Sequence, residues 1–171
     1  MKRALALAVT IFATASIAHA PVPSRALRLQ LQAGALQGLL EFHLPAAAAR
    51  LYAPARDPAV ALVPVALAGL QIEADGAALQ PKVSDASVRP QPDGALDASF
   101  LLAIGPARHS LRISAESGAP LPVTLIAQSG VKLSLQDGPG APIRGGLALR
   151  PRPGLPCLIS ISASEARDTP R

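Results

Sequence analysis

The sequence predicts a single all-β sandwich of about eight to ten short, mainly antiparallel strands behind an N-terminal signal peptide. Apolar and polar residues alternate in many short runs, which places one face of each run in a core and the other in water. Breaks rich in Pro, Gly, Asp and Ser separate these runs at intervals of roughly ten residues. The 18 prolines suit this architecture because most of them fall in the breaks.

The N-terminus has the layout of a secretory signal peptide. Two basic residues precede an apolar run, Ala4–Ile17, and small residues follow it. The run is shorter than the ~20 residues that span a bilayer, so we expect no membrane span once the leader is removed. Residues 1–18 are the predicted leader, which makes His19 the first residue of the processed chain. Cleavage after Ala20 also fits the small-residue pattern but leaves a proline at the new N-terminus. The predicted location is therefore the periplasm or the secreted fraction.

The processed chain is long enough for one domain. Residues 19–164 are predicted to form the sandwich, about 150 residues in all, and residues 165–171 a flexible polar tail. Without the two basic residues of the leader, 14 Lys and Arg face 11 Asp and Glu, for a formal charge of +3. These basic residues are scattered and aromatic residues are few, so the chain lacks the charged and stacking surfaces of nucleic-acid binders.

The N-terminal half of the domain begins with a predicted hairpin that joins Ser24–Gln32 to Leu36–Leu44. The next segment, Ala46–Ala59, allows a single helical turn because its prolines prevent anything longer. The stretch Ala59–Leu70 is uncharged and nearly all apolar. With Pro64 in its middle, it is interpreted as a buried segment or an interrupted edge strand, and a loop in contact with a membrane is the alternative.

The stretch Leu96–Ala115 predicts a central hairpin. Apolar residues occupy alternate positions before and after the break Gly105–Arg108, which contains Gly and Pro. Phe100 is one of only three phenylalanines in the chain and is the expected anchor of the core.

The remaining strands are predicted from the same alternation or from apolar runs between turn signals such as Asp75-Gly76 and Pro90–Gly94. They are Leu70–Ala74, Val83–Val88, Val123–Ile126, Val131–Leu135, Ile143–Leu149 and Cys157–Ala163. The predicted core contains Leu29, Leu31, Leu40, Phe42, Phe100, Leu102, Leu111, Ile113, Leu133 and Ile159. Cys157 is the only cysteine, so no internal disulfide can form, and we expect it to be buried rather than reactive.

No motif of a known catalytic chemistry is present. The chain has no Gly-x-Ser-x-Gly elbow and no phosphate-binding loop. Asp93 and Asp97 are close in sequence, but the first is explained as a turn residue and the second as the solvent face of its strand. We therefore expect no enzyme, and a hydrolytic enzyme remains as the lesser alternative.

The three histidines are the candidate metal ligands. If processing exposes His19, its amino group and imidazole can chelate copper or nickel, and a second imidazole can complete the site. His43 is expected on the polar face of its strand and His109 at the mouth of the central hairpin. The sequence does not decide whether they meet, and three solvent-exposed histidines without a ligand are the simpler interpretation.

Several segments resemble one family. Ala18–Pro21, Ser24–Leu31 and Gly38–Leu44, with Leu70–Gly76 and His109–Arg112 further on, are similar to the exported N-terminal β-domain of hydrogenase/urease accessory proteins of the nickel-permease-like type. The resemblance does not extend to the membrane part of those proteins. It implies an exported β-sandwich linked to metal supply.

These observations predict a periplasmic, non-catalytic accessory or binding module that acts through contacts with another envelope protein and needs no cofactor. The uncharged stretch Ala59–Leu70 is the first candidate contact region, since an exposed apolar segment marks an interface. A metal-binding accessory protein that holds nickel or copper through His19, His43 and His109 is the alternative.

Overall fold

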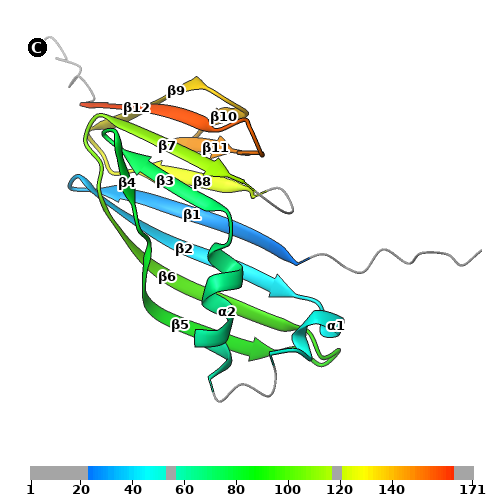
Figure 1. Cartoon of the computed structure of the whole chain (residues 1–171). Helices are drawn as coiled ribbons and strands as arrows, with labels where there is room; N and C mark the ends of the chain where they lie inside the picture. Colours follow the sequence, from blue (N-terminus) through cyan, green and yellow to red (C-terminus); the bar gives the residue numbers. More distant parts are fainter. Residues whose placement is uncertain (1–22, 53–56, 117–120, 164–171) are drawn as a thin grey trace, which may run out of the picture.

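The computed structural model describes residues 23–52, 57–116 and 121–163. Of these residues, 62% lie in strands and 11% in helices, which confirms the all-β prediction. The described strands form two sheets, of seven and five strands, packed as a β-sandwich (Figure 1). The predicted leader and tail lie outside the described residues.

The seven-stranded sheet has the order β10-β11-β8-β1-β2-β6-β5, and all neighbours are antiparallel except the parallel pair β1 and β8. In chain order its strands are β1 (Ser24–Gln32), β2 (Ala35–Leu44), β5 (Lys82–Pro90), β6 (Leu96–Pro106), β8 (Val123–Ala127), β10 (Gly140–Ile143) and β11 (Gly146–Leu149). The predicted hairpin of β1 and β2 is confirmed. Its turn residues Ala33 and Gly34 both have positive φ, as a two-residue turn between twisted strands requires.

The five-stranded sheet is antiparallel throughout, with the order β4-β3-β7-β12-β9. Its strands are β3 (Leu70–Ala74), β4 (Ala77–Leu79), β7 (Ser110–Ala115), β9 (Val131–Asp137) and β12 (Cys157–Ala163). Most predicted strands are therefore present. The segment Ile143–Leu149, predicted as one strand, is instead the turn and second strand of the hairpin β10–β11, because Gly145 takes a positive φ and reverses the chain.

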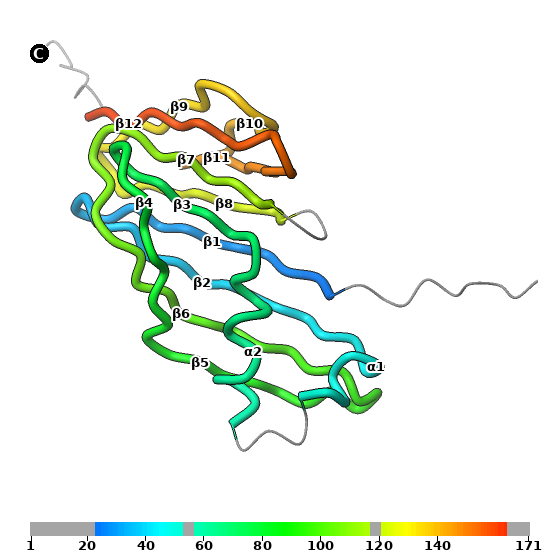
Figure 2. Tube along the Cα trace, viewed as in Figure 1, coloured from blue at the N-terminus to red at the C-terminus, as the bar shows by residue number. Residues whose placement is uncertain are grey.

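The predicted central hairpin is wrong. Alternation is correct on both sides of the break, but β6 pairs with β2 and β5, whereas β7 pairs with β3 and β12 in the other sheet. Figure 2 shows the chain leaving the end of β6 and entering β7 in the second layer. The break Gly105–Arg108 is therefore a crossover between sheets. Periodicity fixes which face of a strand is buried, but it does not fix the strand's partner.

The stretch Ala59–Leu70 is not an edge strand, and it is buried only in part. Most of it forms the helix α2 (Pro58–Leu67), which follows the single turn α1 (Ala46–Ala49). Asp57 caps α2, since its Oδ1 accepts hydrogen bonds from the amides of Ala59 (3.0 Å) and Val60 (3.3 Å). A proline at the first helical position needs no hydrogen-bond partner for its nitrogen. Pro64 removes one internal hydrogen bond without ending the helix.

Helix α2 completes the cover of the core. It packs against β5 and β6, where the smaller sheet does not reach, so the inner face of the large sheet is covered by the five-stranded sheet and by α2 (Figure 1). Leu62 and Ala66 are fully buried in this contact. All the predicted core residues are buried, except that Leu133 is only partly buried.

Cys157 is fully buried, as predicted. Its S–H donates a hydrogen bond to the carbonyl of Pro139 at 3.3 Å. Burial raises the pKa of the Cys157 thiol, which disfavours the reactive thiolate.

Asp75 holds the crossover between β6 and β7. Its carboxylate accepts hydrogen bonds from the backbone amides of Arg108 (2.9 Å), His109 (2.8 Å) and Ser110 (2.9 Å). These bonds stabilise the charged form and hold the pKa of Asp75 below its usual range. The Asp75-Gly76 turn, predicted from sequence, thus also fixes the point where the chain enters the second sheet.

Replacing Asp75 by Asn should lower the stability of the fold at neutral pH. The folded-state pKa of Asp75 lies below its unfolded value, so its contribution is complete above the unfolded pKa, near 3.9, and is lost as pH falls through the folded value. Urea unfolding of the wild type and Asp75→Asn should therefore differ at neutral pH and converge in acid. Asp85→Asn is the control, because its carboxylate bonds only the adjacent amide of Ala86. A difference that persists unchanged into acid would contradict this account.

Gly146→Ala should destabilise the sandwich. A Cβ at this position would overlap the carbonyl oxygen of Leu125 and lie 3.0 Å from the Cα of Ile126, both backbone atoms of the neighbouring strand β8. We expect a loss of about 1–3 kcal/mol by chemical unfolding. Gly38→Ala is the control, because the nearest atoms to its Cβ are the ends of the Leu29 and Ile104 side chains, which can adjust. Equal losses for the two variants would show that the close approach of β11 to β8 is not what requires glycine.

Candidate functional site

The outer face of the seven-stranded sheet carries a row of polar side chains near the start of β1. Strands β1, β2, β6 and β5 are consecutive in the sheet, and their registers pair Ser24 with His43, His43 with Asp97, and Asp97 with Arg89. Alternation explains the row, since the flanking residues Phe42 and Ala98 point into the core. Four strands thus present their polar residues side by side.

These side chains line a cleft of about 610 Å³. The next row along the strands adds Glu41, Ser99 and Ser87, which the registers also place side by side. The cleft is open to solvent and contains groups of both charges. It is an open surface cleft rather than an enclosed cavity.

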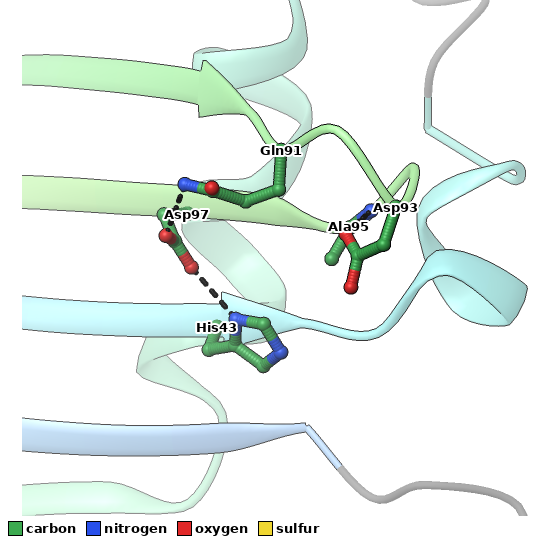
Figure 3. A network of polar contacts seen from close by, with 5 residues as sticks. All are labelled: His43, Gln91, Asp93, Ala95 and Asp97. Atoms are coloured by element: carbon green, nitrogen blue, oxygen red, sulfur yellow. Dashed lines mark hydrogen bonds and ion pairs between the residues drawn. The ribbon is translucent and has the colours of Figure 1, made fainter.

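His43, Asp97 and Gln91 form a hydrogen-bonded chain within the cleft (Figure 3). Nδ1 of His43 lies 2.7 Å from Oδ1 of Asp97, and Nε2 of Gln91 donates to Oδ2 of Asp97 at 2.5 Å. Because a carboxylate only accepts, the hydrogen of the neutral imidazole resides on Nδ1, and Nε2 keeps its lone pair. Asp97 and Gln91 therefore fix both the tautomer and the orientation of His43.

The turn between β5 and β6 places Gln91 over Asp97. The amide of Gln91 donates to the carbonyl of Ala95 (2.8 Å), and Oδ1 of Asp93 accepts from the amide of Ala95 (3.0 Å). Gly94 takes a positive φ within this turn. The predicted role of Asp93 as a turn residue is confirmed, and its carboxylate does not take part in the chain of His43.

Arg25 connects the cleft region to the helix on the opposite side of the sheet. Its guanidinium donates to the carbonyls of Ala66 (3.1 Å) and Ala68 (2.5 Å), at the C-terminal end of α2. A cation is favourable there because the last carbonyls of a helix carry partial negative charge. Burial lowers the pKa of Arg25, but a guanidinium stays protonated. Arg25 thus fixes the end of α2 against β1.

An apolar groove of about 340 Å³ adjoins the cleft on the same face. Leu39, Leu101 and Ile126 line it, and Leu101 and Ile126 are 47% and 44% exposed. Arg28 lines the groove and Glu41 lines the cleft, and the two form an ion pair at 3.2 Å. This ion pair marks the boundary between the polar and apolar parts of the face.

The structure separates two of the predicted metal ligands. His43 pairs with Asp97 near one end of β6, whereas His109 follows the other end of that strand. Nine residues of strand lie between these ends, which corresponds to roughly 30 Å. His43 and His109 are both exposed, but they cannot share one ion. His19 lies outside the described residues.

Ser24, His43 and Asp97 have the residue types of a catalytic triad, but they do not form one. In the part of the chain that the structure describes, His43 is bonded to Asp97, and no hydrogen bond joins it to Ser24. A hydrolytic enzyme of this kind needs a nucleophile bonded to the histidine. Asp97 orients His43, but Ser24 is not bonded to it.

Within residues 23–52, 57–116 and 121–163, no three His, Cys, Asp or Glu side chains are grouped as a metal site would require. Neither of the helices in these ranges has the length and apolar character needed to cross a membrane.

Comparisons with known proteins add little. No protein-family model matches the chain, and no curated protein matches it. A solved structure described as native yeast LTA4 hydrolase is similar over 86% of this chain, at 12% sequence identity and a TM-score of 0.25. The chain spans 30% of the length of that protein. None of these findings bears on the resemblance to nickel-permease-like accessory proteins, which stays a prediction.

Alternation predicts Asp97 on the solvent face of its strand, which is correct, but it does not predict the pairing with His43. The two residues are 54 positions apart, and only the register of β2 against β6 brings them together. The place of Ser24 depends on the register of β1 against β2, and that of Gln91 on the turn between β5 and β6. Alternation alone places Ser24, His43 and Asp97 on polar faces.

Removing the Asp97 carboxylate should change the tautomer of His43. In the wild type the neutral ring should carry its hydrogen on Nδ1, and in Asp97→Ala the Nε2–H form should increase because the acceptor is gone. Nitrogen chemical shifts of the imidazole, measured by NMR where the ring is neutral, distinguish the two forms. Glu41→Ala removes a neighbouring carboxylate that does not bond His43 and should leave the tautomer unchanged. An unaltered tautomer in Asp97→Ala would show that Asp97 does not determine which nitrogen of His43 carries the hydrogen.

Proposed function

We propose that this chain is an exported accessory module that binds another envelope protein through the outer face of its seven-stranded sheet. The observation that carries the proposal is the joining of the polar cleft and the apolar groove on that one face. Exposed Leu101 and Ile126 supply apolar contact, and the oriented His43–Asp97 pair supplies polar contacts that fix the position of a partner. The leader-like N-terminus supports the envelope as the place of action.

Three of the four edge strands of the described sheets are less suited to binding than this face. Edge strand β5 carries Lys82 and Pro90 and has a bulge near Ser84, and edge strand β10 contains Pro142. Strand β4 has only three residues. Charges, prolines, bulges and short length are the features that protect edges from pairing with another chain. A partner is therefore better accommodated by the side chains of the face than by backbone pairing at these three edges.

The stretch Ala59–Leu70 is a weaker contact surface than expected. Leu62 and Ala66 are buried in the core, and Val60 is exposed on the outer side of α2 together with Pro64, one turn later. Its apolar composition is explained by packing against β5 and β6. The groove around Leu101 replaces it as the candidate contact region.

Site-specific photo-crosslinking tests the proposal. A photoreactive residue in place of Leu101, in the protein exported in its native cell, should give a discrete adduct with an envelope protein. The same residue in place of Leu158 is the matched control, since Leu158 is an exposed leucine on the outer face of the other sheet. Leu101→Asp should abolish recovery of the partner in a pull-down, and Leu158→Asp should retain it.

Three results would count against the proposal. Adducts of equal yield from both positions would indicate unspecific contact, and no adduct from Leu101 would remove the face as an interface. Turnover of a small substrate by the purified protein, with no partner recovered, would favour the enzyme alternative instead.

A further inference from the structure

The two carboxylates that line the polar cleft already have partners. Glu41 is paired with Arg28 at 3.2 Å. Asp97 accepts hydrogen bonds through both of its oxygens, from Nδ1 of His43 at 2.7 Å and from Nε2 of Gln91 at 2.5 Å (Figure 3). Neither carboxylate therefore depends on a further cation of the cleft.

The two arginines that line the cleft differ in their contacts. The guanidinium of Arg25 is bonded to carbonyls at the end of α2. Arg89 lies opposite Asp97 in the β5–β6 pair, yet within residues 23–52, 57–116 and 121–163 its exposed guanidinium has no hydrogen bond or ion pair. A guanidinium stays protonated, so this charge is permanent. It is available to a molecule that enters the cleft.

The groups around Arg89 suit an acidic ligand. The planar fork of a guanidinium matches the two oxygens of a carboxylate and can form two parallel hydrogen bonds with it. Ser87 and Ser99 line the same part of the cleft and are paired with each other across β5 and β6. Their hydroxyls can donate further hydrogen bonds to an oxygen of the ligand.

The apolar groove lies at a defined distance from Arg89. Leu101 follows Asp97 by four residues on β6, and both lie on its outer face, about 13 Å apart along the strand. Arg89 is one strand away from Asp97, which makes its separation from Leu101 roughly 14 Å. In an extended segment, residues i and i+4 lie on one face about 13 Å apart. A segment laid along the strands thus reaches both places with two residues at this spacing.

We propose that Arg89 binds the carboxylate of an Asp or Glu side chain on the protein partner, in an extended segment whose aliphatic residue four positions away occupies the groove at Leu101. The inference rests on the proposed function, because it names the chemistry of the partner that binds this face. Leu101 and Ile126 supply the apolar contact. Arg89 supplies the charge complementarity that selects the partner and fixes its register.

The test uses the protein captured at Leu101 as the probe, purified and titrated against the full exported chain. Arg89→Glu should weaken binding at least about tenfold, and Arg89→Ala should weaken it less. Wild-type affinity should fall as salt is raised, and Arg89→Ala should show a smaller salt dependence. Lys132→Glu is the matched control, because it makes the same change of charge at an exposed residue of β9 in the other sheet. It should bind as the wild type does.

Charge reversal on the partner identifies the contact itself. A photoreactive residue in place of Ser87, on the same strand as Arg89, locates the segment of the partner that lies over this part of the cleft. Replacing the acidic residue of that segment with Lys should weaken binding to the wild type and restore binding to Arg89→Glu. Circular dichroism of each variant verifies that it is folded.

The outcomes separate this inference from the proposed function. No adduct at Leu101 would overturn both. A partner that is captured at Leu101 but binds the wild type and Arg89→Glu equally would overturn the inference alone. Equal losses in Arg89→Glu and Lys132→Glu would do the same, since they would reflect only net charge. Binding to phosphatidylglycerol vesicles that Arg89→Glu abolishes, with no protein captured, would overturn both in favour of a lipid headgroup.

Discussion

The pairing of β2 with β1 on one side and β6 on the other is the constraint on which the rest of this structure depends. The pairing of Ser24–Gln32 with β2 fixes which residues of β1 face the core. The pairing of β2 with β6 fixes which residues of β6 face it. A slip of one residue in either ladder would move buried leucines such as Leu40 to solvent and polar residues such as His43 into the core. Burial of the aliphatic side chains thus fixes the register, and the register in turn brings Asp97 to His43.

Much of the fold could be predicted because alternation is a direct consequence of one-sided burial. It identified the strand faces, and nine of the ten core residues that it named are buried, including Phe100. The partner of each strand could not be predicted in this way, because the break Gly105–Arg108 suits a hairpin turn and a crossover equally. The contact that holds the crossover comes from Asp75, which is far away in sequence. The error at α2 had a local cause. Pro64 by itself favours an interrupted strand, but Asp57-Pro58 supplies both an N-cap and a first-turn proline for a helix.

The candidate site was less accessible to sequence reasoning than the fold. Its groups come from three strands and a turn. Gln91 and Asp97 are only six residues apart, but His43 is 54 residues away from Asp97. His43 was recognised as a polar-face histidine, but its support by Asp97 and Gln91 depends on tertiary register. The same register separates His43 from His109, two candidate metal ligands that the sequence alone does not distinguish. Residue types therefore suggested the chemistry, and only the sheet determined which of these residues can act together.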